Sequence, residues 1–382
     1  MKTMIQSKKY KTNSPIILVD LGRQYKSIKK DVNAAIKRVL ESSHFIQGPE
    51  YEAFAKEFAA YCETSACVPV ANGTDALILV LRALGVKSGD EVITSSMTFI
   101  ATVEAITSVG AKPVLVDVDP KTYTLNINQI ESKITAQTKA LIPVHLYGHF
   151  ADMDPVLALA KNRGLHVIED ACQAHGARYK GKCAGSMGVA GCFSFYPAKN
   201  LGCYGDGGAV VSNNRNLIAR VARLANHGSV KKYEHIEEGV NSRLDELQAA
   251  ILRVKLKHLD RWNEKRRALA NLYRKNLRGV GDIVLPYAAD YGEHVYHLFV
   301  IQTAKRAELS CFLAGHKIST QIHYPTPLHL LEAYRYLNLP RGSFPVAESI
   351  CEKVLSLPLF PELKTSEINF ICEKIKEFYK KS

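Results

Sequence analysis

The feature that most constrains this chain is the alternation, between residues 91 and 212, of short apolar runs with segments of helical periodicity. Most of the apolar runs have hydrophobic residues at odd and even positions alike, which indicates strands buried on both faces. Strands and helices that alternate in this way predict an α/β fold with a mostly parallel central sheet covered by helices. The expected strands are 91–94, 113–118, 140–146, 165–170 and 208–212, and the expected helices among them are 99–109 and 154–163.

The pattern changes near residue 242. A long helical repeat covers 242–275, and Ser242 with Asp245 resembles a capping box at its start. Shorter elements follow, with strands at 295–301 and 318–323 and helices at 306–313, 345–355 and 366–380. A chain of 382 residues exceeds one small core, so we expect a large domain, 1–250, and a smaller C-terminal α+β domain, 251–382.

The N-terminal part of the large domain shows two further helical repeats, at 26–41 and 50–62. The residues before them are polar and basic and have no apolar stretch of the kind that a secretory signal needs. We expect the first residues, about 14 of them, to be disordered. No apolar run in the sequence reaches the roughly 18 residues that a membrane span requires, so no membrane partner is expected.

The net charge of +13 fits two classes of partner, a nucleic acid or a small polyanion. The lysines and arginines are spread along the chain, and their densest cluster, 255–267, falls on the expected long helix. A solvated helix face explains such a cluster, so we expect no nucleic-acid partner. The nine cysteines are scattered, without zinc-ligand spacing, and indicate a reduced, cytoplasmic setting. Cys192, Cys311 and Cys372 lie in apolar runs and are expected to be buried free thiols.

One lysine stands at the end of an apolar, aromatic run. The run is residues 191–196, Lys199 follows it, and a loop with four glycines comes next. A lysine in this place is either an ordinary surface cation at a strand end or an amine directed into a pocket. Ligands of parallel sheets bind beyond the carboxyl ends of the strands, and Phe99 and Asp170 also follow expected strands. We therefore interpret Lys199 as a pocket amine that carries a cofactor as a Schiff base.

Three neighbouring features each have a structural and a functional interpretation. Gly73 begins a helix that Thr74 or Asp75 can cap, and the free N–H groups there either end an ordinary helix or bind an anion. Asp170 is either a helix cap or the partner of a cofactor ring nitrogen. Phe99 is either a core residue or a ring that stacks on a ligand.

Other side chains around these positions have similar alternatives. The Gln173 amide can reach a ring hydroxyl, and the Ser194 hydroxyl can bind a phosphate or a neighbouring carbonyl. His175 is expected to be a packed structural histidine.

The order and spacing of these residues resemble fold type I enzymes that use pyridoxal 5′-phosphate (PLP). More closely, the chain resembles the DegT/DnrJ/StrS-type family of nucleotide-sugar aminotransferases, over about residues 15–380. The motifs that carry the resemblance are 72–77, 169–176, 193–202, 205–209 and 241–250. Ala198 departs from the family pattern, in which many members have glycine. The lysine is intact, whereas related PLP sugar dehydratases have a histidine in its place.

The resemblance assigns a role to each matching position. It implies that Lys199 is the Schiff-base lysine, that Asp170 pairs with the pyridinium nitrogen and that Gln173 lies near the ring oxygen. Phe99 occupies the ring-stacking position. It implies phosphate ligands at Gly73, Thr74 and Ser194. It also implies that Asn241 reaches the phosphate of a neighbouring subunit's cofactor, so the expected assembly is a homodimer with shared active sites.

Residues 321–330 resemble one branch of the family, which aminates C3 of dTDP-linked 3-keto-6-deoxyhexoses. In that branch the residues matching Tyr196, His323 and Tyr324 lie near the sugar. The alternative interpretation of His323 and Tyr324 is that they form a strand end before a proline-rich turn. The implied substrates are a keto nucleotide sugar and L-glutamate, in the biosynthesis of an amino sugar for a surface polysaccharide or a secondary metabolite. Alternatives are a C4-keto or UDP-linked 3-keto substrate, or a non-catalytic regulator with the same fold.

Overall fold

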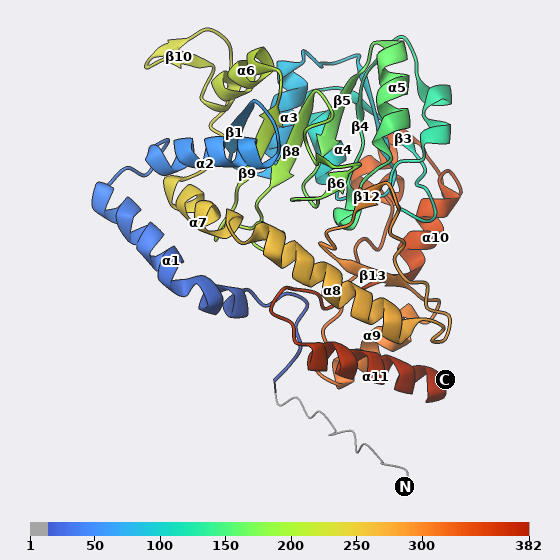
Figure 1. Cartoon of the computed structure of the whole chain (residues 1–382). Helices are drawn as coiled ribbons and strands as arrows, with labels where there is room; N and C mark the ends of the chain where they lie inside the picture. The colour runs from blue at the N-terminus through green and yellow to red at the C-terminus, as the bar shows by residue number, and fades with distance from the viewer. Residues whose placement is uncertain (1–13, 382) are drawn as a thin grey trace.

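A seven-stranded sheet forms the centre of the computed structural model, which describes residues 14–381 (Figure 1). The strand order is β1-β9-β8-β5-β4-β2-β3. β2, β3, β4, β5 and β8 run parallel, whereas β9 is antiparallel to both β8 and β1. The bounds are β1 Ala66–Val70, β2 Glu91–Ser95, β3 Lys112–Val116, β4 Thr138–Ile142, β5 His166–Asp170, β8 Ala190–Ser194 and β9 Gly208–Ser212. The prediction of a mostly parallel α/β sheet is confirmed.

Helices cover both faces of this sheet, as the apolar strand residues require. Successive strand residues point to opposite faces, so one face presents Val92, Ile142, Ile168, Cys192 and Val210, and the other presents Ile93, Leu141, Val167, Phe193 and Val211. The first face packs against α3 (Gly73–Ala83), α4 (Ala101–Ser108) and α6 (Arg215–Ala225). The second packs against α2 (Pro49–Tyr61), α5 (Met153–Arg163) and α7 (Glu246–Leu256).

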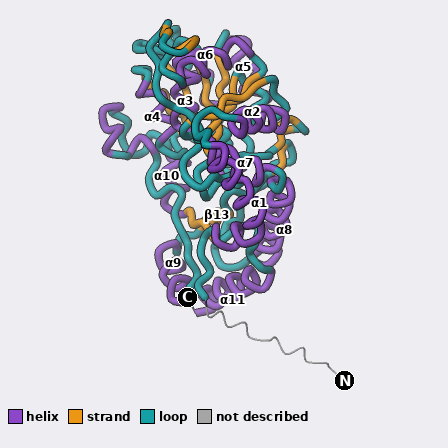
Figure 2. Tube along the Cα trace, turned by 90° about the vertical axis from the view of Figure 1, so that its left-hand side faces the viewer, coloured by secondary structure: helices purple, strands orange, loops and turns teal. Residues whose placement is uncertain are grey.

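The C-terminal third builds a separate apolar cluster below the sheet (Figures 1 and 2). The antiparallel pair β13 (Phe299–Gln302) and β14 (Val354–Leu357) packs there with α8 (Leu259–Leu277), α9 (Arg306–Gly315) and α11 (Thr365–Lys381). α10 (Pro345–Lys353) joins a further cluster with β3 and β13. α1 (Leu21–Ser42) lies along α7. The predicted boundary at residue 250 falls inside α7, and the division into two domains stays a prediction.

Small elements complete the fold. The short strands are β6 Arg178–Tyr179, β7 Lys182–Cys183, β10 Ser229–Lys231, β11 Glu234–His235 and β12 Gly292–Glu293. Short 3-10 helices occupy Ile127–Gln129, Glu131–Lys133, Leu146–Gly148, Leu328–Leu330 and Glu332–Leu337. Within the described range, no helix combines the length and apolar character needed to cross a bilayer. The expected disorder of the first residues lies outside the described residues.

Some sequence expectations are wrong in detail. The repeat over 242–275 is two helices, α7 and α8, and α7 begins only at Glu246. Ser242 caps no helix, because its hydroxyl accepts the Ala71 N–H at 3.2 Å instead. The segment 318–323 is not a strand and makes only isolated bridges, one of them between Gln321 and Ser356. Cys192 and Cys372 are buried as expected, but Cys311 is exposed.

Candidate active site

A cavity of about 780 Å³ opens beyond the carboxyl ends of the parallel strands, where ligands of such sheets bind. It contains every residue that the sequence predicted for the site except Asn241. These lining residues are Gly73, Thr74, Phe99, Asp170, Gln173, Ser194, Tyr196, Lys199, His323 and Tyr324. They come from five separate segments of the chain, so the fold assembles them.

Lys199 enters the cavity from the loop after β8. Its N–H donates to the Tyr196 carbonyl at 2.9 Å, which closes a tight turn. Burial lowers the pKa of the Lys199 amine below its ordinary value. A lysine with a lowered pKa has a larger fraction of free amine near neutral pH, and the free amine is the form that acts as a nucleophile or base. The surface-cation interpretation of Lys199 is therefore wrong.

The loop that carries Lys199 is held from α7 and α8. Asn200 donates through Nδ2 to Asn263 Oδ1 at 2.8 Å and to the Val295 carbonyl at 3.1 Å. Lys255 is fully buried, and its Nζ donates to the Gly202 carbonyl at 2.6 Å. These contacts fix the backbone on the C-terminal side of Lys199, so the amine has a defined position in the cavity.

Asp170 ends β5 with its carboxylate buried. Oδ2 accepts the Thr102 hydroxyl at 2.8 Å, and Oδ1 accepts the Cys172 N–H at 3.2 Å. No helix begins in the described residues next to Asp170, so the helix-cap alternative is wrong. A buried carboxylate held by neutral donors in a cavity can bind a cationic group there. Thr102 was not predicted, although its i+4 spacing from Thr98 is visible in the sequence.

The N-terminus of α3 forms another wall of the cavity. The Asn72 side chain accepts the Asp75 N–H at 2.8 Å and caps the helix, so the expected caps, Thr74 and Asp75, are wrong. The first N–H groups of a helix have no partner within it and form a ready anion site. A β-carbon on Gly73 would lie 2.7 Å from Ser194 Cβ and 2.9 Å from Cys172 Sγ, so only glycine permits this approach.

Gln173 connects the inner part of the cavity to its C-terminal wall. Its Oε1 accepts the Tyr147 N–H at 2.7 Å, and its Nε2 donates to the Tyr324 hydroxyl at 3.1 Å. The neighbouring His323 shares a hydrogen between Nδ1 and the Ser356 hydroxyl at 2.8 Å. Burial and the charge of Lys199 lower the pKa of His323 to about 4, so the ring is neutral at pH 7.

Two aromatic rings of the cavity are open to solvent. Phe99 is 51% exposed and Tyr196 is 56% exposed. The Phe99 ring lies 5.8 Å from that of Tyr324. The core interpretation of Phe99 is wrong, because a core ring is not half exposed. Exposed rings at the mouth of a cavity are suited to contact a ligand or another chain.

The two remaining predicted residues lie outside the cavity lining. Asn241 is exposed, and its backbone pairs with Asn226. His175 is 1% exposed and packs against Phe193 and Phe195, which confirms that it is a packed histidine. The segment 17–19, Ser319 and His297 also line the cavity, although no motif in the sequence pointed to them.

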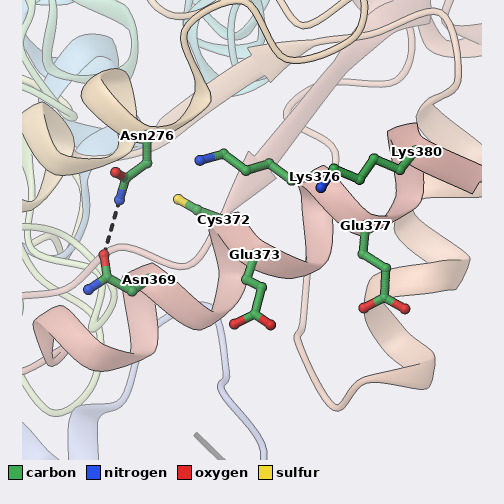
Figure 3. A pocket seen from close by; sticks show the side chains of 7 residues that line it. All are labelled: Asn276, Asn369, Cys372, Glu373, Lys376, Glu377 and Lys380. Carbon is green, nitrogen blue, oxygen red and sulfur yellow. Dashed lines mark hydrogen bonds between the residues drawn. The ribbon is translucent and has the colours of Figure 1, made fainter. Parts of the chain in front are cut away.

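A second hollow lies between α8 and α11 and shares no lining residue with the first (Figure 3). Asn276 and Asn369 bridge it with a 3.0 Å hydrogen bond. Burial raises the pKa of the Cys372 thiol to about 12, so the thiol is protonated and unreactive at neutral pH.

A family comparison identifies the chain. Residues 26–376 match the model of the DegT/DnrJ/EryC1/StrS aminotransferase family. The chain belongs to this family of aminotransferases. The match covers the cavity residues from Asn72 to Tyr324, whereas the lining residues 17–19 precede it. The resemblance stated from the motifs is confirmed.

Among the similar proteins, one is named as a sugar transaminase and one as a regulatory protein, and a solved structure contains a ketimine intermediate. The aminotransferase is 48% identical to the dTDP-3-amino-3,4,6-trideoxy-alpha-D-glucose transaminase of Streptomyces venezuelae, over 94% of this chain and 95% of that one. It is 46% identical to the "Pleiotropic regulatory protein" of Geobacillus stearothermophilus, over 95% and 98% of the two chains. The solved structure of S. venezuelae DesV in complex with a ketimine intermediate has a TM-score of 0.94, at 48% identity and coverage of 96% and 99%.

The cofactor of the aminotransferase is PLP, which solved relatives hold in its pyridoxal or pyridoxamine form. The residues of the cavity fit this group. The bare helix start at Gly73 suits a phosphate, the buried Asp170 carboxylate suits a protonated ring nitrogen, and the Lys199 amine suits an aldehyde carbon. The predictions of fold type I and of a PLP enzyme are confirmed.

Proposed function

We propose that this aminotransferase moves the amino group of L-glutamate to C3 of a dTDP-linked 3-keto-6-deoxyhexose. The observation that carries the proposal is that Lys199 and Asp170 line one cavity with Tyr196, His323 and Tyr324. The similar S. venezuelae enzyme is named for a dTDP-3-amino sugar. The product would serve the biosynthesis of an amino sugar for a surface polysaccharide or a secondary metabolite.

In this proposal each residue of the inner cavity has one task. PLP, when bound, supplies an electron sink that stabilises negative charge on the carbon beside the amine. Asp170 keeps the ring nitrogen protonated, held in place by Thr102. Gln173 would hold the ring oxygen, and Phe99 would contact the face of the ring. The N–H groups at the start of α3, Thr74 and Ser194 bind the phosphate.

Lys199 is the proton carrier. With the donor bound beside it, the free amine of Lys199 would remove the proton from the donor's Cα and hold it for return. The lowered pKa of Lys199 favours the free amine for this step. In the second half of the reaction the same amine moves protons in the reverse order, now at C3 of the sugar.

The sugar is proposed to lie against the outer aromatic wall. Tyr196 is exposed at the cavity mouth, and the Tyr324 hydroxyl is already fixed by Gln173. A tyrosine offers a face for the sugar ring and a hydroxyl for its polar groups. The protein's net charge of +13 would attract the diphosphate of the nucleotide.

The working unit is proposed to be a homodimer with shared sites. Asn241 is exposed and lies outside the cavity of its own chain. The hairpin β10–β11 and its flank expose Val230, Tyr233, Ile236 and Val240. A surface of this kind suits a second copy of the chain. The free cysteines in the described chain support the expected cytoplasmic setting.

The test is a panel of substrates offered to the pyridoxamine form, which glutamate should produce from the purified enzyme. A dTDP-3-keto-6-deoxy sugar should restore the PLP absorbance fastest. Faster restoration by a 4-keto or a UDP-linked sugar would assign the alternative substrate. Lys199→Ala should lose both the Schiff-base absorbance and turnover, and transamination by that variant would overturn the role of Lys199.

A regulatory function is the second candidate, because one similar protein carries that name. The intact Lys199 and Asp170 favour catalysis over this candidate. A gel shift with DNA at physiological salt separates the two: catalysis without a shift supports the enzyme, and specific binding without turnover supports the regulator.

A further inference from the structure

His297 lies in the cavity wall with an unused ring nitrogen. It precedes β13 and lines the same cavity as Lys199, with only 7% of its surface exposed. Its Nδ1 is fully buried and has no hydrogen-bond partner within residues 14–381. Buried polar atoms in folded proteins usually have partners, so an unpaired ring on a cavity wall indicates a missing ligand.

The backbone around His297 is tied to two segments of the active site. Asn200, next to Lys199, donates to the carbonyl of Val295 at 3.1 Å. On the other side, Gly148 packs closely against two backbone atoms. A β-carbon on Gly148 would lie 3.0 Å from the backbone nitrogen of His297 and 3.1 Å from the Gln173 carbonyl oxygen. His297 is therefore fixed between the lysine loop and the Gln173 segment.

The groups that act electrically on His297 are all cations or groups that can become cations. They are Lys199 from the β8–β9 loop, Arg266 from α8, His323 from the C-terminal wall and His175 after β5. Arg266 is buried, and its guanidinium donates to the carbonyl of Tyr296, next to His297, at 3.4 Å and to the Leu359 carbonyl at 2.9 Å. Glu362 acts on Arg266 but is not among the groups that act on His297.

The protonation of His297 follows from its surroundings. Burial, and then these positive neighbours, hold the pKa of His297 well below its usual range, so the ring is neutral at pH 7. A neutral ring has one N–H. Nδ1 is fully buried, and Nε2 likewise makes no hydrogen bond within residues 14–381. The tautomer protonated on Nε2 leaves only a lone pair on the buried Nδ1 and offers its N–H to a ligand.

The proposed reaction brings an anion to this wall. The donor carries a carboxylate on the carbon that Lys199 must reach, and the described residues that line the cavity include no arginine. Lys199 is occupied with the proton, and His323 already shares its Nδ1 with Ser356. We propose that His297 donates its Nε2–H to the carboxylate of the amino donor and so holds the donor's Cα beside Lys199.

This inference rests on the proposed function. The experiments below distinguish a failure of the role of His297 from a failure of the proposed function. The variants are His297→Leu, which removes the donor, and His297→Gln, which places an amide N–H at a similar reach. The matched control is His175→Leu, because His175 is equally buried and lies near Lys199 but does not line the cavity. Thermal unfolding of each PLP-loaded variant checks that the fold is retained.

The first measurement is binding of glutarate, a dicarboxylate without an amino group, to the PLP-loaded enzymes by calorimetry. We expect His297→Leu to bind at least tenfold more weakly than the wild type, and His297→Gln and His175→Leu to stay within about threefold of it. Equal affinity of His297→Leu and the wild type overturns the inference, as does a loss of equal size in the His175 control.

The second measurement compares the two half-reactions. We expect His297→Leu to raise the KM for glutamate at least tenfold and to leave the KM for the keto sugar within about threefold. An equal rise for both substrates overturns the inference. Failure of the wild type to react with glutamate contradicts the proposed donor instead.

Discussion

Thr102 donates its hydroxyl hydrogen to Oδ2 of Asp170 at 2.8 Å, and the Thr98 hydroxyl lies 3.1 Å from that of Thr102. Thr102 lies in the first turn of α4 and contacts the carboxylate directly, whereas Thr98 precedes α4 and contacts only the Thr102 hydroxyl. Asp170 needs such a partner, because a buried carboxylate without donors is costly. The pair therefore sets the direction in which the carboxylate faces the cavity.

We expect Thr102→Val to weaken PLP binding by about tenfold, because a hydrogen bond to a charged group contributes roughly 1.5–3 kcal/mol. The change keeps the shape of the side chain and removes only the hydroxyl. Equilibrium dialysis of the variant against PLP measures the loss. Thr102→Ser keeps the hydroxyl donor and should bind PLP nearly as tightly as the wild type. Equal PLP affinities of Thr102→Val and Thr102→Ser would show that the hydrogen bond to Asp170 does not contribute to PLP binding.

Gly73→Ala should disturb the phosphate end of the site. The new methyl group would lie 2.7 Å from Ser194 Cβ and 2.9 Å from Cys172 Sγ, so α3 or β8 must move. We expect the affinity for PLP to fall at least tenfold, since the N–H groups at the helix start lose their positions. Gly315→Ala is the control, because no atom lies within 4 Å of its added β-carbon. Unchanged PLP affinity in Gly73→Ala would exclude the phosphate role.

Lys199 should titrate below the usual pKa of lysine, about 10.4. Burial is the cause, because it disfavours the charged amine. The amine is protonated below its pKa and reactive above it, so labelling of Lys199 by an acylating reagent should begin at a lower pH than labelling of an exposed lysine. Lys37, with 73% of its side chain exposed, is the internal reference, and mass spectrometry follows both in protein freed of PLP. Identical pH profiles for the two lysines would contradict the expectation.

Lys255 should make stability depend on pH. Burial lowers its pKa to about 8, so between pH 8 and the unfolded value near 10.4 the unfolded chain binds more protons than the folded one. Stability therefore rises with pH in this window through Lys255. Urea unfolding measures the free energy of unfolding of the wild type and of Lys255→Met at pH 8 and pH 10. From pH 8 to pH 10, this free energy should rise in the wild type relative to the variant by at most about 3 kcal/mol. A difference that stays constant, or that shrinks with rising pH, would contradict the lowered pKa.

The sheet and the inner site could be predicted because their signals are local. β5 and β8 are buried on both faces, so they appear in the sequence as largely apolar runs. Asp170 is the last residue of β5, and Lys199 lies in the loop that follows β8. The cap of α3 was misplaced onto Thr74 or Asp75 because a run of polar residues offers several candidates. Only the backbone turn shows that Asn72 is the one that accepts the Asp75 N–H.

Other features depend on contacts between distant segments. The stretch around Gln321 has the composition of a strand but finds partners only at single positions, such as Ser356. His297 lies in an apolar run, and its unpaired nitrogen and positive neighbours arise only when α8, β13 and the lysine loop meet. No spacing in the sequence could have revealed them.

The role proposed for Asn241 can be tested by mixing two defective subunits. In the proposed dimer each site combines Lys199 of one chain with Asn241 of the other. Lys199→Ala and Asn241→Ala homodimers should both be weak or inactive. In a mixed dimer one site keeps both native residues and the other loses both. Random mixing makes half of all dimers mixed, so activity should return to about one quarter of the wild-type level.

Co-expression with two different affinity tags allows the mixed dimer to be purified and assayed directly, and it should then reach about half of the wild-type activity. The control is a mixture of Lys199→Ala with Asp170→Ala, which both belong to the same chain's cavity. In that mixture no site contains two native residues, so no activity should return. No recovery in the Asn241 mixture would show that Asn241 serves its own chain or no site at all. Recovery in the control would show that Lys199 and Asp170 do not act within one chain's cavity.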